Sequence, residues 1–403
     1  MPTKTEFKSF PWDIPQSKPD RPLSEAMERM YDNYLSPRPE DNDLFTSFKY
    51  TKLEGLDYGG HDGCISRRDP SKIIKANGRY YVWYTKRHTE LPPRGAQHCS
   101  DTVPSTDWDL ADIFYATSED GFTWQEQGVA INRPDKPTLG WRSVATPDIL
   151  CWQGRYYLYY QTFNEPSMLK GDNCPVAMAS ADSPDGPWTR IDKEIIENGE
   201  PGSWDQYSIH GPSLLVRDGK IFLYYKAAFG DRPEYLCVNG LAIADNPLGP
   251  FEKHPLNPIL NSGHETTYFP FKEGIAAFAI RNGNETNTIQ WSADGVNFKI
   301  ASVTQMMPVG AKAYNPEAFI DTKNGKGIRW GLCHFADKKD PTTKHSYLGR
   351  FDCNLVQGGS NTDMKETDVI HAPEVFFAQS LSEEQQSQCR QRAIDELSEV
   401  SSE

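Results

Sequence analysis

GHDGCISRRDPSKIIKANGRYYVWYTKRH, residues 60–88, is the stretch that decides the fold of this chain. It holds an acidic residue before a proline, Asp69-Pro70, then a short apolar piece, an Asn-Gly pair and an aromatic run. Asn-Gly between two apolar runs is a strong signal for a β-hairpin, because both turn positions favour a positive φ. The stretch therefore predicts one strand that turns tightly into a second.

The same order of features returns along the chain. SVATPDILCWQGRYYLYYQTF (143–163) and SIHGPSLLVRDGKIFLYYKAAF (208–229) repeat it with Gln-Gly and Asp-Gly turns. A small-residue strand, a Ser/Asp turn and an aromatic residue follow each copy, and two weaker copies cover 263–298 and 314–352. Repeats of this length with several short strands are typical of the blades of a β-propeller.

We therefore expect an all-β fold, a five-bladed β-propeller over residues 60–355, because a single blade cannot bury both of its faces. The first strand of each blade should line a central channel, so residues early in these strands should converge. The alternative is that these residues only form turns. The predicted blade anchors are Asp69, Asp148, Gly211, Glu265 and Pro316.

Both flanks of the repeat region predict a helix. In the N-terminal arm, residues 1–59, apolar residues at helical spacing occur over Pro22–Leu35, and Ser24 is a candidate N-cap. In the C-terminal extension, residues 356–403, a polar helix is expected over Leu381–Val400. A single short helix is not stable alone, so the first must pack on the propeller or on a second subunit.

The composition narrows the function classes. The formal net charge of −14 over 403 residues argues against nucleic acid or an anionic membrane as partner, since both are bound through basic patches. Eight cysteines are scattered without metal-ligand spacing, which favours a reducing compartment. The first residues lack an apolar signal segment, so we expect a cytoplasmic protein, or a periplasmic one if a signal peptide has been removed.

Two carboxylates stand at anchor positions. Asp69 follows two arginines, Arg67 and Arg68; an adjacent guanidinium would lower its pKa and keep it an anion, which suits a general base. Asp148, in ATPDIL, is placed at the equivalent point of the next blade and could orient substrate hydroxyls. In each case the alternative is a turn aspartate with solvated neighbours.

Two further anchors involve histidine. The pair His264-Glu265 opens the fourth blade, and a histidine beside a carboxylate is easier to protonate, as a general acid requires. At the third anchor stands Gly211, which has no side chain, and His210 is the nearest polar substitute. Whether His210 acts on the substrate or only packs stays open.

Other residues near the anchors could contact a sugar. Aromatic rings stack on sugar faces, and arginine binds hydroxyls or anionic groups through its planar fork. The chain has no P-loop, dinucleotide fingerprint, HExxH or GxSxG motif, which argues against those chemistries. The candidate substrate-binding residues are Arg68, Trp83, Trp141, Arg142, Tyr207 and Glu317, together with Asp148 and His210.

RRDPSKII followed by GRYYVWYTKR, the ATPDIL strand, the His-Glu pair and the N-terminal helix together resemble glycoside hydrolase family 117 over nearly the whole chain. The resemblance implies an exo-acting, inverting hydrolase that releases 3,6-anhydro-L-galactose from neoagaro-oligosaccharides, with an α-1,3 linkage. It implies Asp69 as the general base, His264 as the general acid and Glu265 as its support. A further family aspartate falls at Gly211.

The resemblance also implies a homodimer that exchanges N-terminal helices, and in some members a divalent cation near the propeller axis; no cofactor is expected to be required. Two alternatives remain. One is a related propeller enzyme on another glycan, such as an arabinosidase or a mannoside phosphorylase. The other is a non-catalytic sugar-binding propeller, which the missing acidic residue at Gly211 favours.

Overall fold

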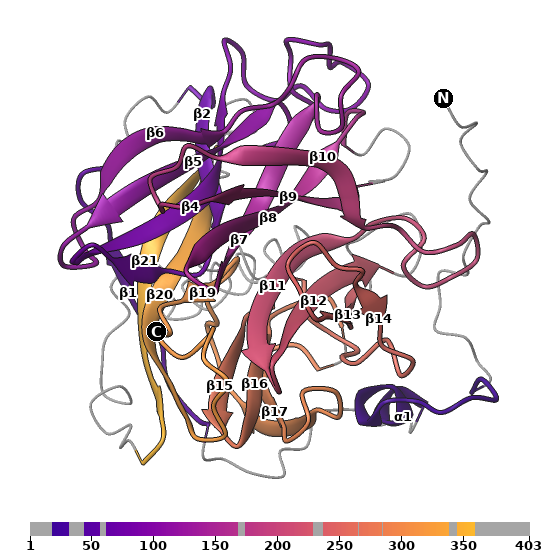
Figure 1. Cartoon of the computed structure of the whole chain (residues 1–403). Helices are drawn as coiled ribbons and strands as arrows, with labels where there is room; N and C mark the ends of the chain where they lie inside the picture. The colour runs from indigo at the N-terminus through magenta and orange to yellow at the C-terminus, as the bar shows by residue number, and fades with distance from the viewer. Residues whose placement is uncertain are drawn as a thin grey trace, which may run out of the picture.

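The computed structural model describes residues 18–31, 44–56, 62–167, 174–228, 237–264, 266–283, 285–337 and 345–358. Within these ranges the chain is nearly all β, with one helix, α1 (Glu25–Tyr31). The strands are antiparallel to their neighbours and group into four sheets around a common centre (Figure 1).

The first three sheets follow the predicted repeats in order, and each is built from consecutive strands. Their members are β2 (Ile65–Pro70), β3 (Ile74–Ala76), β4 (Arg79–His88), β5 (Ala111–Ser118) and β6 (Gln125–Ile131); then β7 (Ser143–Trp152), β8 (Arg155–Phe163), β9 (Val176–Ala181) and β10 (Thr189–Ile196); then β11 (His210–Arg217), β12 (Lys220–Ala228), β13 (Cys237–Ala244) and β14 (Glu252–Lys253).

The fourth and largest sheet has two groups of strands that meet where β15 pairs with β20. Only two residue pairs join them, Phe271 with Lys326 and Lys272 with Gly325. Its members are β15 (Tyr268–Lys272), β16 (Gly274–Ala279), β17 (Thr288–Ser292) and β18 (Lys299–Val303), with β19 (Lys312–Ala313), β20 (Gly325–Asp337), β21 (His345–Val356) and β1 (Lys49–Lys52).

The predicted hairpins are confirmed at the three strongest repeats. Asn77-Gly78, Gln153-Gly154 and Asp218-Gly219 join β3 to β4, β7 to β8 and β11 to β12, and both residues of each pair have a positive φ. This is the conformation that a two-residue turn needs to match the twist of its strands. The sequence signal and the backbone geometry agree at each turn.

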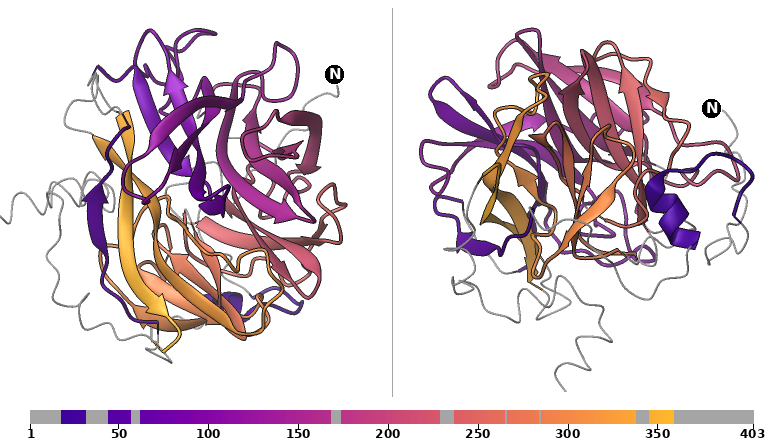
Figure 2. Two further views of the ribbon diagram at one scale, coloured as in Figure 1. Left: turned by 60° about the vertical axis from the view of Figure 1, so that its left-hand side comes forward. Right: turned by 90° about the horizontal axis from the view of Figure 1, so that it is seen from below.

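The first strands of the sheets contact one another in turn. β2 contacts β7, β7 contacts β11, and β11 contacts β15; β20, the strand that follows β19, contacts β2. β1 completes the group of β19, β20 and β21 by pairing with β21, and the two strands lie side by side in Figure 2 although they come from opposite ends of the chain. Buried aromatic and aliphatic side chains fill the spaces between neighbouring sheets.

Helix α1 lies within the predicted N-terminal segment and packs on the body of its own chain. Ser24 caps it as expected, since its hydroxyl accepts the N–H of Met27 at 3.3 Å. Met27 and Met30 are buried with Val238, and the Arg29 guanidinium binds the buried carboxylate of Glu285 at 2.7 Å. The predicted C-terminal helix lies outside the described residues.

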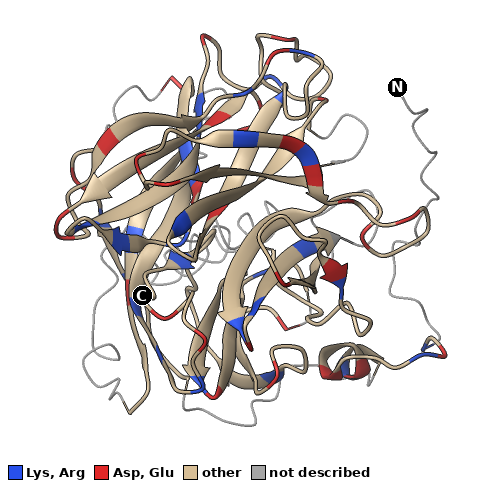
Figure 3. Ribbon diagram, viewed as in Figure 1, with Lys and Arg blue, Asp and Glu red and all other residues tan. Residues whose placement is uncertain are grey.

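Charged residues concentrate on the outside. Figure 3 shows acidic residues on the outer strands β10 and β14 and on α1. The seven cysteines of the described ranges form no disulfide with one another. Among the helices that the structure describes, none is long and apolar enough to cross a membrane.

Candidate active site

Three first strands carry the same backbone distortion at an X-Pro pair. In β2, Arg68 pairs with Thr85 and Pro70 with Tyr84, which leaves Asp69 as an extra residue in a β-bulge with φ +49°. β7 has the same bulge at Thr146-Pro147, φ +49°, and β11 has it at Gly211-Pro212, φ +56°. Bulges re-aim a side chain and often lie beside active sites.

This geometry corrects the predicted alignment of the second anchor. The residue of β7 that matches Asp69 is Thr146, because both precede the proline and share the positive φ. Asp148 lies two residues later and matches Ser71. Gly211 does match Asp69, as the sequence predicts.

A side chain from the preceding sheet accepts the backbone N–H of each bulge residue. Asp69 N–H donates to Nδ1 of His334 at 3.3 Å, and Thr146 N–H donates to the hydroxyl of Thr85 at 2.7 Å. Gly211 N–H donates to the side-chain oxygen of Gln161 at 3.1 Å. Neighbouring sheets are thereby locked together at the points where the bulges lie.

Asp69 is surrounded by donors and cations. Its carboxylate accepts from Arg68 Nε at 2.8 Å and from the Thr146 hydroxyl at 3.4 Å, and His334 Nδ1 lies 3.3 Å away. Burial raises the pKa of this carboxyl, but the charge and hydrogen bonds of the Arg68 guanidinium outweigh it, and the net shift is downward. Asp69 is therefore an anion at neutral pH. Arg67 points elsewhere and pairs with Glu126 at 2.9 Å.

Residues of the loop between β4 and β5 hold Arg68 in place. The ring of Trp108 lies 4.8 Å from the Arg68 guanidinium carbon, and the Asp107 carboxylate lies 3.7 Å from its Nη1. Burial raises the pKa of Asp107, but Arg87 and Arg68 oppose it and lower that pKa to about 2. A permanent anion and an aromatic face thus fix the cation beside Asp69.

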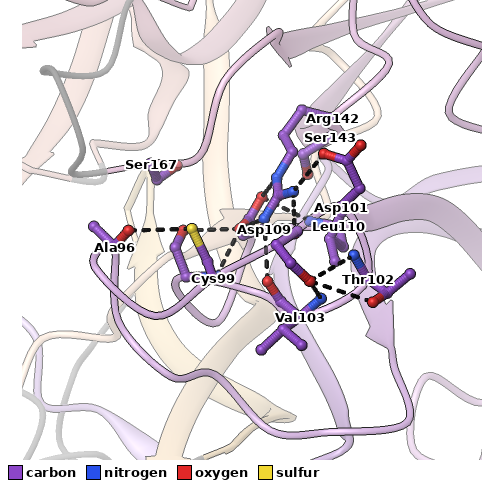
Figure 4. Close-up of polar contacts among 12 residues, drawn as sticks. Ala96, Cys99, Asp101, Thr102, Val103, Asp109, Leu110, Arg142, Ser143 and Ser167 are labelled. Carbon is purple, nitrogen blue, oxygen red and sulfur yellow. Dashed lines mark hydrogen bonds and ion pairs between the residues drawn. The ribbon is translucent and has the colours of Figure 1, made fainter.

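Arg142 fixes the same loop from the other side (Figure 4). Its guanidinium binds both oxygens of Asp109, at 2.7 and 2.5 Å, and donates to the carbonyl oxygens of Ser100 and Val103. Arg142 is fully buried. It is a structural residue and not the predicted substrate ligand, because its donors are used by the protein itself.

Comparison with known proteins agrees with this geometry. No family model matches the chain. Zg3597, a family 117 glycoside hydrolase of the marine bacterium Zobellia galactanivorans, matches with 57% identity and a TM-score of 0.79, covering 85% of this chain and 100% of that one. The chain belongs to glycoside hydrolase family 117.

Two more distant proteins also match this chain. Xylosidase/arabinosidase 43A of Humicola insolens is 26% identical over 167 residues, 37% of this chain and half the length of that enzyme. A structure described as a glycoside hydrolase is 14% identical with a TM-score of 0.52, over 82% of this chain and 96% of its own. The latter shows a shared fold only.

Asp148 lies at the centre of a buried ionic cluster. Its carboxylate accepts from the Lys72 backbone N–H at 2.8 Å, the Lys72 ammonium at 2.6 Å and the Leu214 N–H at 2.9 Å, and Lys312 Nζ lies 3.8 Å away. Burial raises its pKa, but Lys312 and Lys72 outweigh this and lower it. Asp148 is 0% exposed, so the structure offers it no contact with substrate hydroxyls.

A divalent cation does not fit this cluster. Two lysine side chains already surround the single carboxylate. Burial, with a smaller contribution from the charge of Lys72, lowers the pKa of Lys312 to about 7 although Asp148 opposes the shift. Within the described ranges, no group of three His, Cys, Asp or Glu side chains lies close enough to hold a metal ion.

His264 lies among cations, and this reverses the predicted direction of its pKa. Nε2 accepts a hydrogen bond from the Lys226 ammonium at 3.2 Å. Burial and the charges of Lys226 and Arg281 hold its pKa well below the ordinary value, so the imidazole is neutral at pH 7. The expectation of an easily protonated histidine is therefore wrong for the site as it stands. Glu265 lies outside the described residues.

His210 belongs to the same region. It pairs with Lys226 across β11 and β12, and burial and that lysine hold its pKa well below the ordinary value. Its Nε2 is buried without a hydrogen-bond partner. The structure thus brings His210 and His264 together around Lys226.

Two other predicted ligands, Trp83 and Glu317, do not reach this site. Trp83 is fully buried in the core between the first two sheets. Tyr207 is 9% exposed, and its predicted contact with the substrate stays a prediction. Glu317 accepts the N–H of Lys326, which lies eight residues before His334 on β20 and therefore roughly 25 Å from it. Trp141 is partly exposed, with the Lys136 ammonium 4.0 Å from the centre of its ring.

Sequence reasoning missed the residues that complete the site. They lie on second strands and in one loop, away from the anchors: Thr85, Gln161, Lys226, His334, Asp107 and Trp108. A search for the residue opposite each X-Pro bulge would have found Thr85, Gln161 and Lys226, because the pairing register repeats in the first three sheets.

Proposed function

We propose that this chain is an exo-acting, inverting glycosidase that releases a terminal 3,6-anhydro-L-galactose-type sugar, α-1,3-linked, from agar-derived oligosaccharides. The observation that carries the proposal is the state of Asp69, an anion presented on a bulge and held by Arg68 and His334. Membership of family 117 supports the choice of a glycosidic bond as the target.

In this mechanism Asp69 takes a proton from the water that attacks the anomeric carbon. Inversion requires the acid on the opposite side of the bond, roughly 6.5 to 9.5 Å from the base, so that the water fits between them. His264, with Glu265, is the proposed acid. Because Nε2 of the neutral ring accepts from Lys226, the acid role requires that substrate binding draw Lys226 away and that His264 gain a proton.

We further propose that the strands form a five-bladed propeller in which the largest sheet counts as two blades. The two residue pairs between β15 and β20 are a narrow junction, and each of the five groups then has its own first strand facing the centre.

The homodimer remains a proposal as well. Size-exclusion chromatography with light scattering would test it.

Product analysis tests the function directly. The protein is incubated with neoagaro-oligosaccharides, and released sugars are identified by chromatography, with the anomer followed by NMR from the first minutes. We expect anhydro-L-galactose with an inverted anomeric configuration. A retained anomer would contradict the inverting mechanism, and release of internal fragments would contradict exo action.

A second candidate is hydrolysis of an arabinose- or xylose-containing glycan. The similarity to Xylosidase/arabinosidase 43A favours it, although only over 37% of this chain. Aryl α-L-arabinofuranoside and aryl β-D-xyloside distinguish the two candidates, since each releases a coloured phenol only if its sugar is accepted.

A further inference from the structure

Lys226 differs from the residues that join neighbouring sheets by accepting the backbone N–H of a bulge residue. The corresponding positions on the second strands of other sheets hold Thr85, Gln161 and His334, and each accepts a backbone N–H from the next bulge. Lysine has three donors and no acceptor, so Lys226 cannot make this contact. It reaches the ring of His264 instead.

The charge of Lys226 is not balanced by the described residues. Its side chain is buried, the whole residue being 4% exposed, and the structure pairs it with no carboxylate within the described ranges. The Arg281 guanidinium also acts on His264, and the rings of His210 and His264 are neutral, so neither histidine offers Lys226 a negative charge. A buried ammonium group is costly unless an anion pairs with it, so this arrangement calls for a negative partner.

The partner cannot be Asp69. Its carboxylate already accepts from Arg68 and Thr146, and His334 lies 3.3 Å away, on the side of the site formed by the first, second and largest sheets. Lys226 and the unpartnered Nε2 of His210 lie on the third sheet. The two sides of the site therefore differ. The charge of Asp69 is paired with Arg68, whereas Lys226 has no described carboxylate partner and Nε2 of His210 has no hydrogen-bond partner.

Gly211 leaves room beside these donors. A Cβ added to this residue would meet no atom within 4 Å outside its immediate neighbours. Asp69 and Thr146 carry side chains at the same bulge position and the same φ, so the backbone does not require glycine there. Because Gly211 has no side chain, the space next to His210 is open.

We propose that the region bounded by Lys226, His210 and Gly211 binds an oxyanion carried by the substrate, a sulfate ester or a carboxylate on a sugar at the bound end of the glycan. The inference rests on the proposed function, because it assumes that this site receives the end of a glycan. Lys226 Nζ and a ring N–H of His210 donate to the oxyanion, and the space at Gly211 receives the substituent. The substrate then supplies Lys226 with an anion that the described residues do not provide.

Binding to the intact wild-type chain tests this without catalysis. Galactose 6-sulfate, galacturonate and galactose are titrated separately by calorimetry at fixed ionic strength. We expect at least one charged sugar to bind about tenfold or more tightly than galactose, as a charge-assisted hydrogen bond predicts. A preference for the sulfated sugar or for galacturonate identifies the oxyanion. Equal binding of all three overturns the inference.

Substitutions at Lys226 and at Gly211 test whether these two residues cause the preference for a charged sugar. Lys226→Met preserves the volume and should bring the charged and neutral sugars to equal affinity, since replacing a buried charge by an apolar side chain is tolerated by the fold. Gly211→Asp places a carboxylate in the open space and should abolish the preference for the charged sugar, whereas the uncharged Gly211→Asn should keep most of it. If Lys226→Met leaves the preference unchanged, the assignment is wrong.

The same panel separates this inference from the proposed function. Absence of anhydro-L-galactose release would contradict the function, while the difference in affinity would still be measured. Conversely, hydrolysis of neutral neoagaro-oligosaccharides, with no gain for charged ones, would support the function and overturn the oxyanion site.

Discussion

Asp69 and Asp148 are two buried aspartates on neighbouring first strands, and from the sequence they are predicted at equivalent positions of two blades. Both have a pKa below the ordinary value, and both pair with cations. They differ in their donors and position: Asp148 accepts two backbone N–H groups and is closed off, whereas Asp69 lies on a bulge, is 6% exposed and is held by side chains alone. Burial and charge alone do not distinguish a catalytic carboxylate from a structural one.

The largest effect expected from this comparison is on turnover. Asp69→Asn removes the base but keeps the shape, so kcat should fall by about a hundred- to ten-thousandfold while substrate binding changes little. Steady-state kinetics and calorimetry on the same preparation measure both. Wild-type kcat in this variant would rule out Asp69 as the base.

Asp148→Asn should act on stability instead. Removal of the charge leaves Lys72 and Lys312 buried without a counterion, which should cost about 3–5 kcal/mol in the free energy of unfolding. Urea denaturation followed by tryptophan fluorescence measures the loss. An Asp148→Asn protein of normal stability and strongly reduced kcat would show that the two aspartates share one role after all.

The contribution of Asp107 to stability should depend on pH. Its folded-state pKa of about 2 lies below the unfolded value, so its ionised form contributes stability above the unfolded pKa, and this is lost as pH falls toward 2. Asp107→Asn should therefore lose about 2 kcal/mol at pH 7 and progressively less below pH 4. Thermal unfolding of both proteins across this range provides the comparison, and a pH-independent difference would contradict it.

The smallest effect is expected at Glu317. Its carboxylate binds a backbone N–H roughly 25 Å along β20 from His334, the residue that contacts Asp69, so Glu317→Gln should leave kcat/KM unchanged within about twofold. Kinetics on the substrate used for Asp69→Asn give the matched value. A large drop would restore Glu317 to the site that the sequence predicted for it.

Local signals in the sequence were reliable because their causes are local. The Asn-Gly, Gln-Gly and Asp-Gly turns fix a positive φ within two residues, and Asp69 beside Arg68 needs only adjacent positions. The alignment of Asp148 failed because it followed the acidic residue, while the backbone repeat follows the residue before proline. An X-Pro pair marks the bulge whatever side chain precedes it.

The remaining parts of the site depend on residues far apart in the chain. His334 meets Asp69 only after the last sheet has come beside the first, and Lys226 changes the protonation of His264 from another sheet. A neighbouring carboxylate in the sequence predicted a raised pKa for His264, whereas burial and surrounding cations lower it. No local pattern carries that information, because the register between sheets sets it.

The pairing of β1 with β21 has a consequence for synthesis of the protein. Lys49 pairs with Asp352, so a strand made early on the ribosome has no partner until nearly the whole chain has emerged. Contacts of such long range slow folding, because loop closure must precede the gain from pairing. The sheet edge that awaits β1 is open to other strands during that interval, and a chaperone that shields β-edges would raise the yield of active enzyme.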